Sequence, residues 1–211
     1  MGSASGFNSI AGIENVTSGS GNDTLRGDGN ANMLKGGSGD DTYYADSSDS
    51  ITESSGGGTD SVFTDSNTFK LAANVENLTF TGTGDFAGTG NGLANTITGG
   101  SGNDTINAGG GDDTINAGTG DDILNGGAGN DIFIFDIGFG QDTINGFDAN
   151  PANGQDLLDI SGLGITDFAS EVAITDLGSD TLVQIGDDSI LLIGVTGTGA
   201  NAIGYQDFIL A

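Results

Sequence analysis

Residues 99–134 read GGSGNDTIN AGGGDDTIN AGTGDDILN GGAGNDIFI, four copies of one nine-residue pattern. Each copy is a glycine-rich loop that ends in aspartate, followed by three residues centred on an aliphatic or aromatic side chain. Asp104, Asp113, Asp122 and Asp131 therefore recur at identical spacing. Self-similarity at a short fixed period is the sequence signature of a solenoid, so this stretch decides the fold.

The period also predicts which loops lie together. If the first six residues of each copy form a turn and the last three a strand, two copies make one coil, and loops 18 residues apart share an edge. Asp104 then faces Asp122 on one edge, and Asp113 faces Asp131 on the other. Stacked strands lie about 4.8 Å apart. Carboxylates at that separation repel each other unless a cation lies between them.

The residue types indicate which cation this is. Glycines reach positive φ and leave backbone carbonyls free to face inward. Carboxylate and carbonyl oxygens in a flexible arrangement suit calcium, whereas magnesium prefers fewer protein ligands and more waters. The chain has no Cys and no His, which excludes thiolate sites, zinc sites and every His-based catalytic arrangement. We therefore expect calcium as the cofactor, on the order of five ions.

The candidate ligands are the loop aspartates and the glycines whose carbonyls accompany them. In the four regular copies they are Gly100, Gly102, Asp104, Gly109, Gly111, Asp113, Gly118, Gly120, Asp122, Gly127, Gly129 and Asp131. Outside these copies the same position is held by Asp23, Asp41, Asp60, Asn95 and Asp142. Asp60 fits a solvated turn residue equally well. Asn32 and Asn95 stand where the pattern has aspartate, so strong sites are not expected in their loops.

An older duplication is visible along the chain. Residues 13–42 return in looser form as residues 75–105, with Phe86 where the first copy has Asp23, so one ligand is lost there. Residues 45–80 are interpreted as longer, metal-poor coils of the same solenoid. The middle residue of each short strand turns inward. We expect a thin core made of Leu25, Leu34, Tyr43, Ile97, Ile106, Ile115, Leu124 and Phe133.

Charge excludes several kinds of partner. There are 30 acidic and 3 basic residues, a net charge of −27 that opposes a compact state by self-repulsion. Nucleic acid is excluded as a partner because phosphate binding needs clusters of Lys and Arg. Acidic chains with few aromatic residues are often disordered, but these acids are placed at regular positions. The N-terminus lacks the basic and apolar pattern of a signal peptide, and no apolar stretch reaches the length of a membrane span.

The composition of the sequence changes after about residue 146, where long aliphatic residues become more frequent. Residues 181–185 and 190–193 are expected to form a hairpin, and a short helix is expected around 168–172. An atypical terminal unit of this kind protects the strand edges at the end of a solenoid. We therefore expect two regions: a roll over residues 1–145 and a small β-rich cap over residues 146–211.

The loops resemble the nonapeptide G-G-x-G-x-D-x-U-x of RTX proteins, in which U is aliphatic. The resemblance implies a right-handed parallel β-roll with calcium between successive turns. Residues from 131 onward resemble the region that follows the roll in serralysin-type and other type I secreted proteins. That likeness implies export by an uncleaved C-terminal signal ending in Phe208–Ala211. The HExxH segment of serralysins is missing, since the chain has no His.

These expectations combine into an all-β, non-enzymatic, secreted module. It would fold on calcium binding outside the cell and support type I secretion and folding of an extracellular protein. Its partners would be calcium ions, the type I secretion apparatus during export, and an N-terminal effector domain or a polysaccharide. Two alternatives stay open: a polysaccharide-binding accessory module of a secreted enzyme, and a structural, ice-binding or adhesin solenoid.

Overall fold

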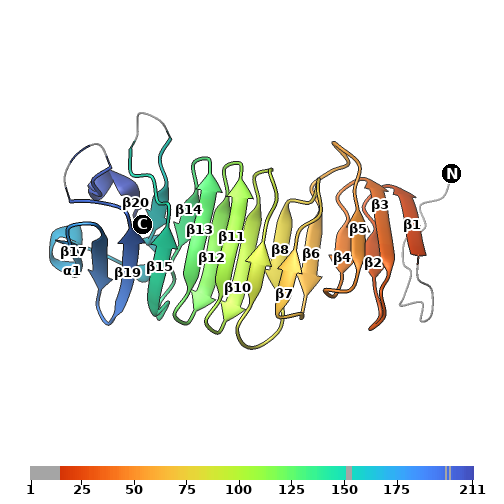
Figure 1. Cartoon of the computed structure of the whole chain (residues 1–211), viewed down its shortest axis with the longest axis horizontal. Helices are drawn as coiled ribbons and strands as arrows, with labels where there is room; N and C mark the ends of the chain where they lie inside the picture. Colours follow the sequence, from red (N-terminus) through yellow and green to blue (C-terminus); the bar gives the residue numbers. More distant parts are fainter. Residues whose placement is uncertain (1–14, 151–153, 198, 200) are drawn as a thin grey trace.

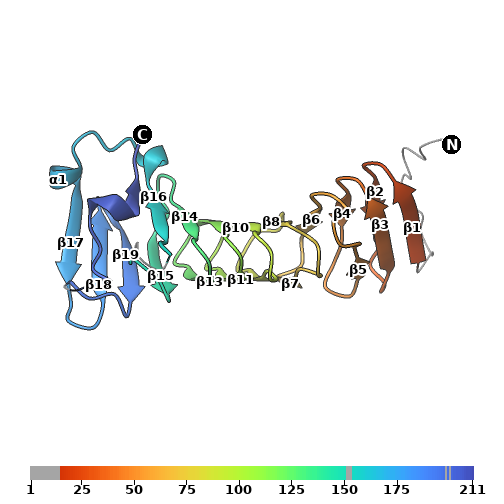
Figure 2. The ribbon, with the colours of Figure 1, turned by 90° about the horizontal axis from the view of Figure 1, so that it is seen from above.

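The computed structural model describes residues 15–150, 154–197, 199 and 201–211. Within these residues the chain is almost entirely β-structure, wound into flat coils that stack along one long axis (Figure 1). The coils begin with β1 at one end, and the C-terminal strands lie at the other (Figure 2). The expected parallel β-roll is confirmed.

One face of the roll is a single parallel sheet of nine strands. In spatial order it contains β2 (Thr24–Arg26), β4 (Thr42–Tyr44), β6 (Ser61–Thr64), β8 (Asn77–Phe80), β10 (Thr96–Ser101), β12 (Thr114–Thr119), β14 (Ile132–Ile134), β16 (Leu157–Asp159) and β20 (Phe208–Ile209).

The other face is divided into two sheets. The first contains β1 (Asn15–Ser20), β3 (Met33–Ser38) and β5 (Ser50–Thr52). The second runs through β7 (Thr68–Lys70), β9 (Ala87–Thr89), β11 (Thr105–Gly110), β13 (Ile123–Ala128), β15 (Gln141–Asn145), β19 (Asp188–Ile193), β18 (Thr181–Ile185) and β17 (Val172–Asp176).

Strand pairing confirms the predicted 18-residue coil in the regular repeats. Thr96 of β10 pairs with Thr114 of β12, and Thr105 of β11 pairs with Ile123 of β13. The coils over residues 45–80 are less regular, because Ser61 of β6 pairs with Asn77 of β8, only sixteen residues on. On the nine-stranded face these coils continue the sheet without a break, whereas the other face divides within them, between β5 and β7.

The core is a column of single side chains between the two faces. Every residue predicted for it is buried, with Leu34, Ile97 and Ile115 wholly inaccessible. Removing one such aliphatic side chain from water contributes about 1.5–3 kcal/mol. Because each coil adds only about two of these residues, the column by itself offers modest stability for so acidic a chain.

The C-terminal region extends both faces of the roll. The predicted hairpin is confirmed as β18 and β19, which pair antiparallel, and the predicted helix as α1 (Phe168–Glu171). β19 also pairs parallel with β15, and β20 pairs with β16. Short 3₁₀ turns occur at Ser161–Leu163 and Tyr205–Asp207. Nowhere in the described chain is there a helix long and apolar enough to cross a membrane.

Candidate metal sites

The loop aspartates form two rows, one along each edge of the roll. In each row a backbone N–H donates to the Oδ1 atom of the aspartate one coil further along the chain. Asp104 donates to Asp122 at 2.7 Å, and Asp113 donates to Asp131 at 2.9 Å. These are the facing pairs that the period predicts. The rows continue through Asp23, Asp41 and Asp60 on one edge and through Asp142 on the other.

The second oxygen of these carboxylates has no partner. Six buried side-chain oxygens in the described part of the chain lack a hydrogen bond, and all are Oδ2 atoms of loop aspartates: Asp41, Asp60, Asp104, Asp113, Asp122 and Asp131. A buried polar atom without a partner costs about 1–3 kcal/mol, and more when it carries charge. A row of such atoms is therefore poorly stable unless a cation binds them.

Backbone carbonyl oxygens lie beside these carboxylates. A methyl group added at Gly99 would collide with Asp104 Oδ2 and would also lie 2.6 Å from the carbonyl oxygen of Ala117 in the next coil. The two oxygens therefore border one small space between successive coils. Carboxylate and carbonyl oxygens are the ligands that calcium prefers. The residues present thus fit the ion that the sequence predicts.

The predicted glycines have the backbone conformation that these loops need. All eight named in the four regular copies have positive φ, between 103° and 144°. At Gly118 a side chain would also collide with the carbonyl oxygen of Gly100 in the preceding coil. The loops can stack at strand separation only because no Cβ intervenes.

Burial raises the pKa of the loop carboxyls. Desolvation is the largest cause, and the charges of neighbouring carboxylates add to it. The pKa of Asp104 rises to about 6, that of Asp113 to about 7 and that of Asp142 to about 8. The pKa values of Asp122 and Asp131 rise for the same main reason, burial. Backbone N–H donors lower these values but do not cancel the effect of burial.

Two loops without aspartate close their edges in other ways. Phe86 stacks on Phe80, with ring centroids 4.6 Å apart. The Nδ2 group of Asn95 donates to the carbonyl oxygens of Val75 and Glu76, both at 3.1 Å. An aromatic pair and an amide thus hold this coil together by contacts within the protein.

Some acidic residues in or beside these rows are absent from the sequence prediction. Glu76 Oε2 accepts the N–H of Asp60 at 2.7 Å. Asp156 Oδ1 accepts the N–H of Asp131 at 2.9 Å. Both residues therefore extend the row of Asp113.

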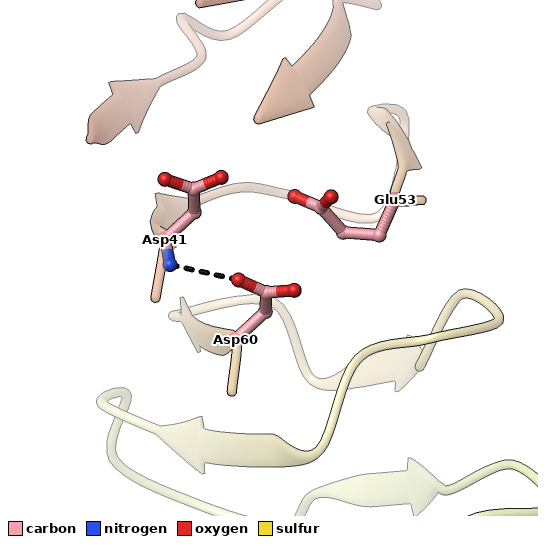
Figure 3. Close-up of side chains that lie close together, drawn as sticks. All are labelled: Asp41, Glu53 and Asp60. Atoms are coloured by element: carbon pink, nitrogen blue, oxygen red, sulfur yellow. Dashed lines mark hydrogen bonds between the residues drawn. The ribbon is translucent and has the colours of Figure 1, made fainter. Parts of the chain in front are cut away.

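Glu53 is a further acidic residue outside the sequence prediction. Glu53 lies with Asp41 and Asp60 in a buried group whose ligand oxygens all lie within 4.8 Å of one another (Figure 3). The register that pairs Lys35 with Thr52 places Glu53 level with Gly36, the first residue of its loop. The sequence signal would have been a glutamate at a loop position that the regular repeats fill with Gly or Ala.

Comparison with known proteins agrees with this geometry. Residues 11–50, 89–124 and 109–141 match the RTX calcium-binding nonapeptide repeat, in four copies. The chain is 48% identical over 84 residues to the endo-1,3-1,4-beta-glycanase ExsH of Rhizobium meliloti. The aligned segment covers 39% of this chain and 18% of that protein. The chain thus spans less than a fifth of the length of this relative.

The chain also matches solved structures, among them two subunits of a mannuronan C5-epimerase from Azotobacter vinelandii. AlgE6R3 has a TM-score of 0.46 and 27% identity, covering 61% of this chain and 79% of that one. AlgE6R2 has a TM-score of 0.40 and 27% identity, covering 58% of this chain and 91% of that one. The extracellular lipase LipA from Serratia marcescens has a TM-score of 0.42 and 17% identity, covering 90% of this chain and 40% of that one.

Proposed function

We propose that this chain, which carries RTX calcium-binding nonapeptide repeats, is a secreted module that folds when calcium binds between its coils. The observation that supports the proposal is the set of six buried Oδ2 atoms, divided between the two rows, that have no hydrogen-bond partner. The ligands we assign are the loop aspartates and glycines predicted from the repeats. The assignment is structural, with no catalytic role.

Calcium concentration would act as the folding switch. Inside a cell calcium is too scarce to fill sites of this type, so the charged loops repel one another and the chain stays extended. Outside, at about ten times the dissociation constant, each filled site stabilises the folded state by about 1.4 kcal/mol. Several such sites together supply a stability of the same order as the unfolding free energy of an ordinary domain, roughly 5–15 kcal/mol.

An extended chain is also the form that an export channel can pass. We propose that the module is exported by a type I secretion apparatus and then supports folding of the extracellular protein that contains it. The short overlap with a much longer glycanase supports this arrangement, in which an effector domain would belong to the same protein. The charge of −27 keeps the unfolded chain soluble during export.

Polysaccharide binding is the second candidate function. Arg26 lies 4.0 Å from the centre of the Tyr44 ring, and Tyr44 stacks on Phe63 with centroids 5.4 Å apart. These three side chains line an outer hollow of about 340 Å³ that Asp46 and Asp65 also border. A hollow lined by aromatic side chains with a few polar groups has the usual form of a small-ligand site. Retardation of the folded chain in a gel containing mixed-linkage glucan, lost in Phe63→Ala, would support this candidate.

A calcium titration tests the folding switch. We expect the whole chain to lack β-structure by circular dichroism in a calcium chelator and to gain it cooperatively as calcium rises. Magnesium at the same concentration should substitute poorly, because it resists giving up its waters for several carbonyl ligands. A β-sheet spectrum that is unchanged by chelation would contradict the switch while leaving the fold intact.

A further inference from the structure

The group formed by Asp41, Glu53 and Asp60 differs from every regular loop of the roll. Asp41 and Asp60 belong to the edge row, and the N–H of Asp41 donates to Asp60 Oδ1 at 2.7 Å. Glu53 comes from the start of the loop that ends in Asp60, and Figure 3 shows its carboxylate facing Asp41. A side-chain carboxylate thus stands where a regular repeat has a residue without one.

The oxygens of this group converge on one space. A methyl group added at Gly36 would collide with Asp41 Oδ2, Glu53 Oε1 and the Tyr43 hydroxyl, so all three border the same point. The corresponding point at Gly99 is bordered by one carboxylate oxygen and one carbonyl oxygen. Oxygens bound to a single calcium lie about 2.4 Å from it and hence within about 5 Å of one another. The ligand oxygens of the three carboxylates meet that limit at 4.8 Å.

Buried oxygen atoms without a hydrogen-bond partner point to a ligand for this group, which clustering of acidic residues alone would not do. Asp41 is 1% exposed and Asp60 is wholly buried, and the Oδ2 atom of each has no hydrogen-bond partner. Glu53 is held in place by other contacts: its Oε1 accepts from Tyr43, and its Oε2 accepts from the N–H groups of Gly37 and Ser54 at 3.2 and 3.1 Å. Glu53 is therefore positioned in advance, and the two aspartates each present a free oxygen.

We propose that Asp41, Glu53 and Asp60 bind one cation in a three-carboxylate site that differs in ligand set from the sites of the regular repeats. The proposal rests on the calcium-dependent folding proposed above and names a distinct site within it. Three carboxylates exceed the charge of a divalent ion, and calcium affinity rises with the number of charged ligands. This site should bind calcium before the regular loops do, and it should favour a trivalent lanthanide even more strongly.

Tyr43 offers a selective readout for this site. Its hydroxyl donates to Glu53, so terbium bound here would lie within a few ångströms of the ring and be excited through it. Tyr44 is the matched control, because its ring packs on Phe63 and Arg26 at the outer hollow. Tyr43→Phe should lose roughly three quarters or more of the tyrosine-excited terbium emission of the whole chain. Tyr44→Phe should keep most of that emission. Equal emission from both variants would overturn the proposal.

Glu53→Gln tests the extra carboxylate directly. It should shift the midpoint of the terbium titration upward by about tenfold, equivalent to about 1.4 kcal/mol. Asp187→Asn, which removes one negative charge from the exposed turn between β18 and β19, should leave that midpoint unchanged. An unchanged midpoint in Glu53→Gln would exclude Glu53 as a ligand.

The same measurements separate this inference from the proposed function. If the wild-type chain binds calcium in calorimetry but Glu53→Gln behaves like wild type, only the three-carboxylate site is wrong. If the wild-type chain binds no calcium at all, the proposed function fails first. If Glu53→Gln does not fold in calcium by circular dichroism, the comparison of Tyr43→Phe with Tyr44→Phe decides.

Discussion

The backbone N–H of Asp113 donates to Oδ1 of Asp131 at 2.9 Å, while Oδ2 of both residues is buried without a partner. One oxygen of each carboxylate thus links two coils, and the other is left for a ligand. Because the N–H donor of each such pair lies one coil before the acceptor, each loop aspartate orders the backbone of the loop that precedes it. Loss of a carboxylate should therefore weaken the loop before it as well as its own.

Protons should partly replace calcium. The pKa of Asp104 is raised to about 6 and that of Asp113 to about 7, from 3.8 in an unfolded chain. The folded state therefore binds more protons than the unfolded state across this window, and stability must fall as pH rises through it. Without calcium, the chain should show more β-structure and a higher melting temperature at about pH 5.5 than at about pH 8.

The opposite trend should appear when calcium is present. Protons then compete with the ion for the same carboxylates, so the calcium midpoint should rise as pH falls. Circular dichroism melts in calcium-free buffer and calcium titrations at the same two pH values check both signs. A calcium-free chain that becomes more stable toward alkaline pH would show that the loop carboxylates are not buried as described.

Two adjacent glycines should respond oppositely to the same substitution. Gly109 has φ of 110°, and a side chain there would collide with the carbonyl oxygen of Asn91 in the preceding coil. At Gly110 the nearest atom, Ala128 O, would lie 3.7 Å away. Gly109→Ala should destabilise the calcium-bound chain by about 1–3 kcal/mol, whereas Gly110→Ala should be neutral or slightly stabilising. Urea unfolding in saturating calcium measures both, and similar losses would contradict the stacked loops.

The regular part of the roll follows from the sequence because each feature there repeats. One period specifies the loop, the inward residue and the 18-residue register, and residues such as Ile106 and Asp122 then lie where the pattern predicts. Repetition also makes the two rows of facing aspartates predictable from the sequence alone.

Single departures from the period were harder to interpret. Glu53 was missed because its role depends on the register of β3 and β5, which a coil of irregular length hides. The sequence identified Phe86 as a lost ligand, but only the packing on Phe80 shows how that edge is closed. The amide contacts of Asn95 with Val75 and Glu76 likewise depend on a coil that no repeat describes.

Asp104 and Asp113 differ in the ligand atoms that the preceding coil offers them. Asp113 Oδ1 accepts the N–H of Asn95 at 2.7 Å, and Asn95 Oδ1 borders the same point as the carbonyl oxygen of Ala108. Asp113 therefore lies between two loops that offer oxygen atoms. Asp104 Oδ1 accepts the N–H of Phe86 at 2.9 Å, and a phenylalanine side chain cannot bind an ion.

Asp113→Ala should therefore be more damaging than Asp104→Ala, although the chemical change is identical. Asp113→Ala removes a ligand on the side of Asp131 and unlinks the oxygen-bearing loop of Asn95, whereas Asp104→Ala affects an ion site only on the side of Asp122. We expect Asp113→Ala to lose more bound calcium and to raise the folding midpoint further, by about 1–2 kcal/mol of additional linkage energy. Calorimetric calcium stoichiometry on both variants measures this. An equal or larger loss in Asp104→Ala would mean that the coil before residue 90 supplies a ligand to Asp104.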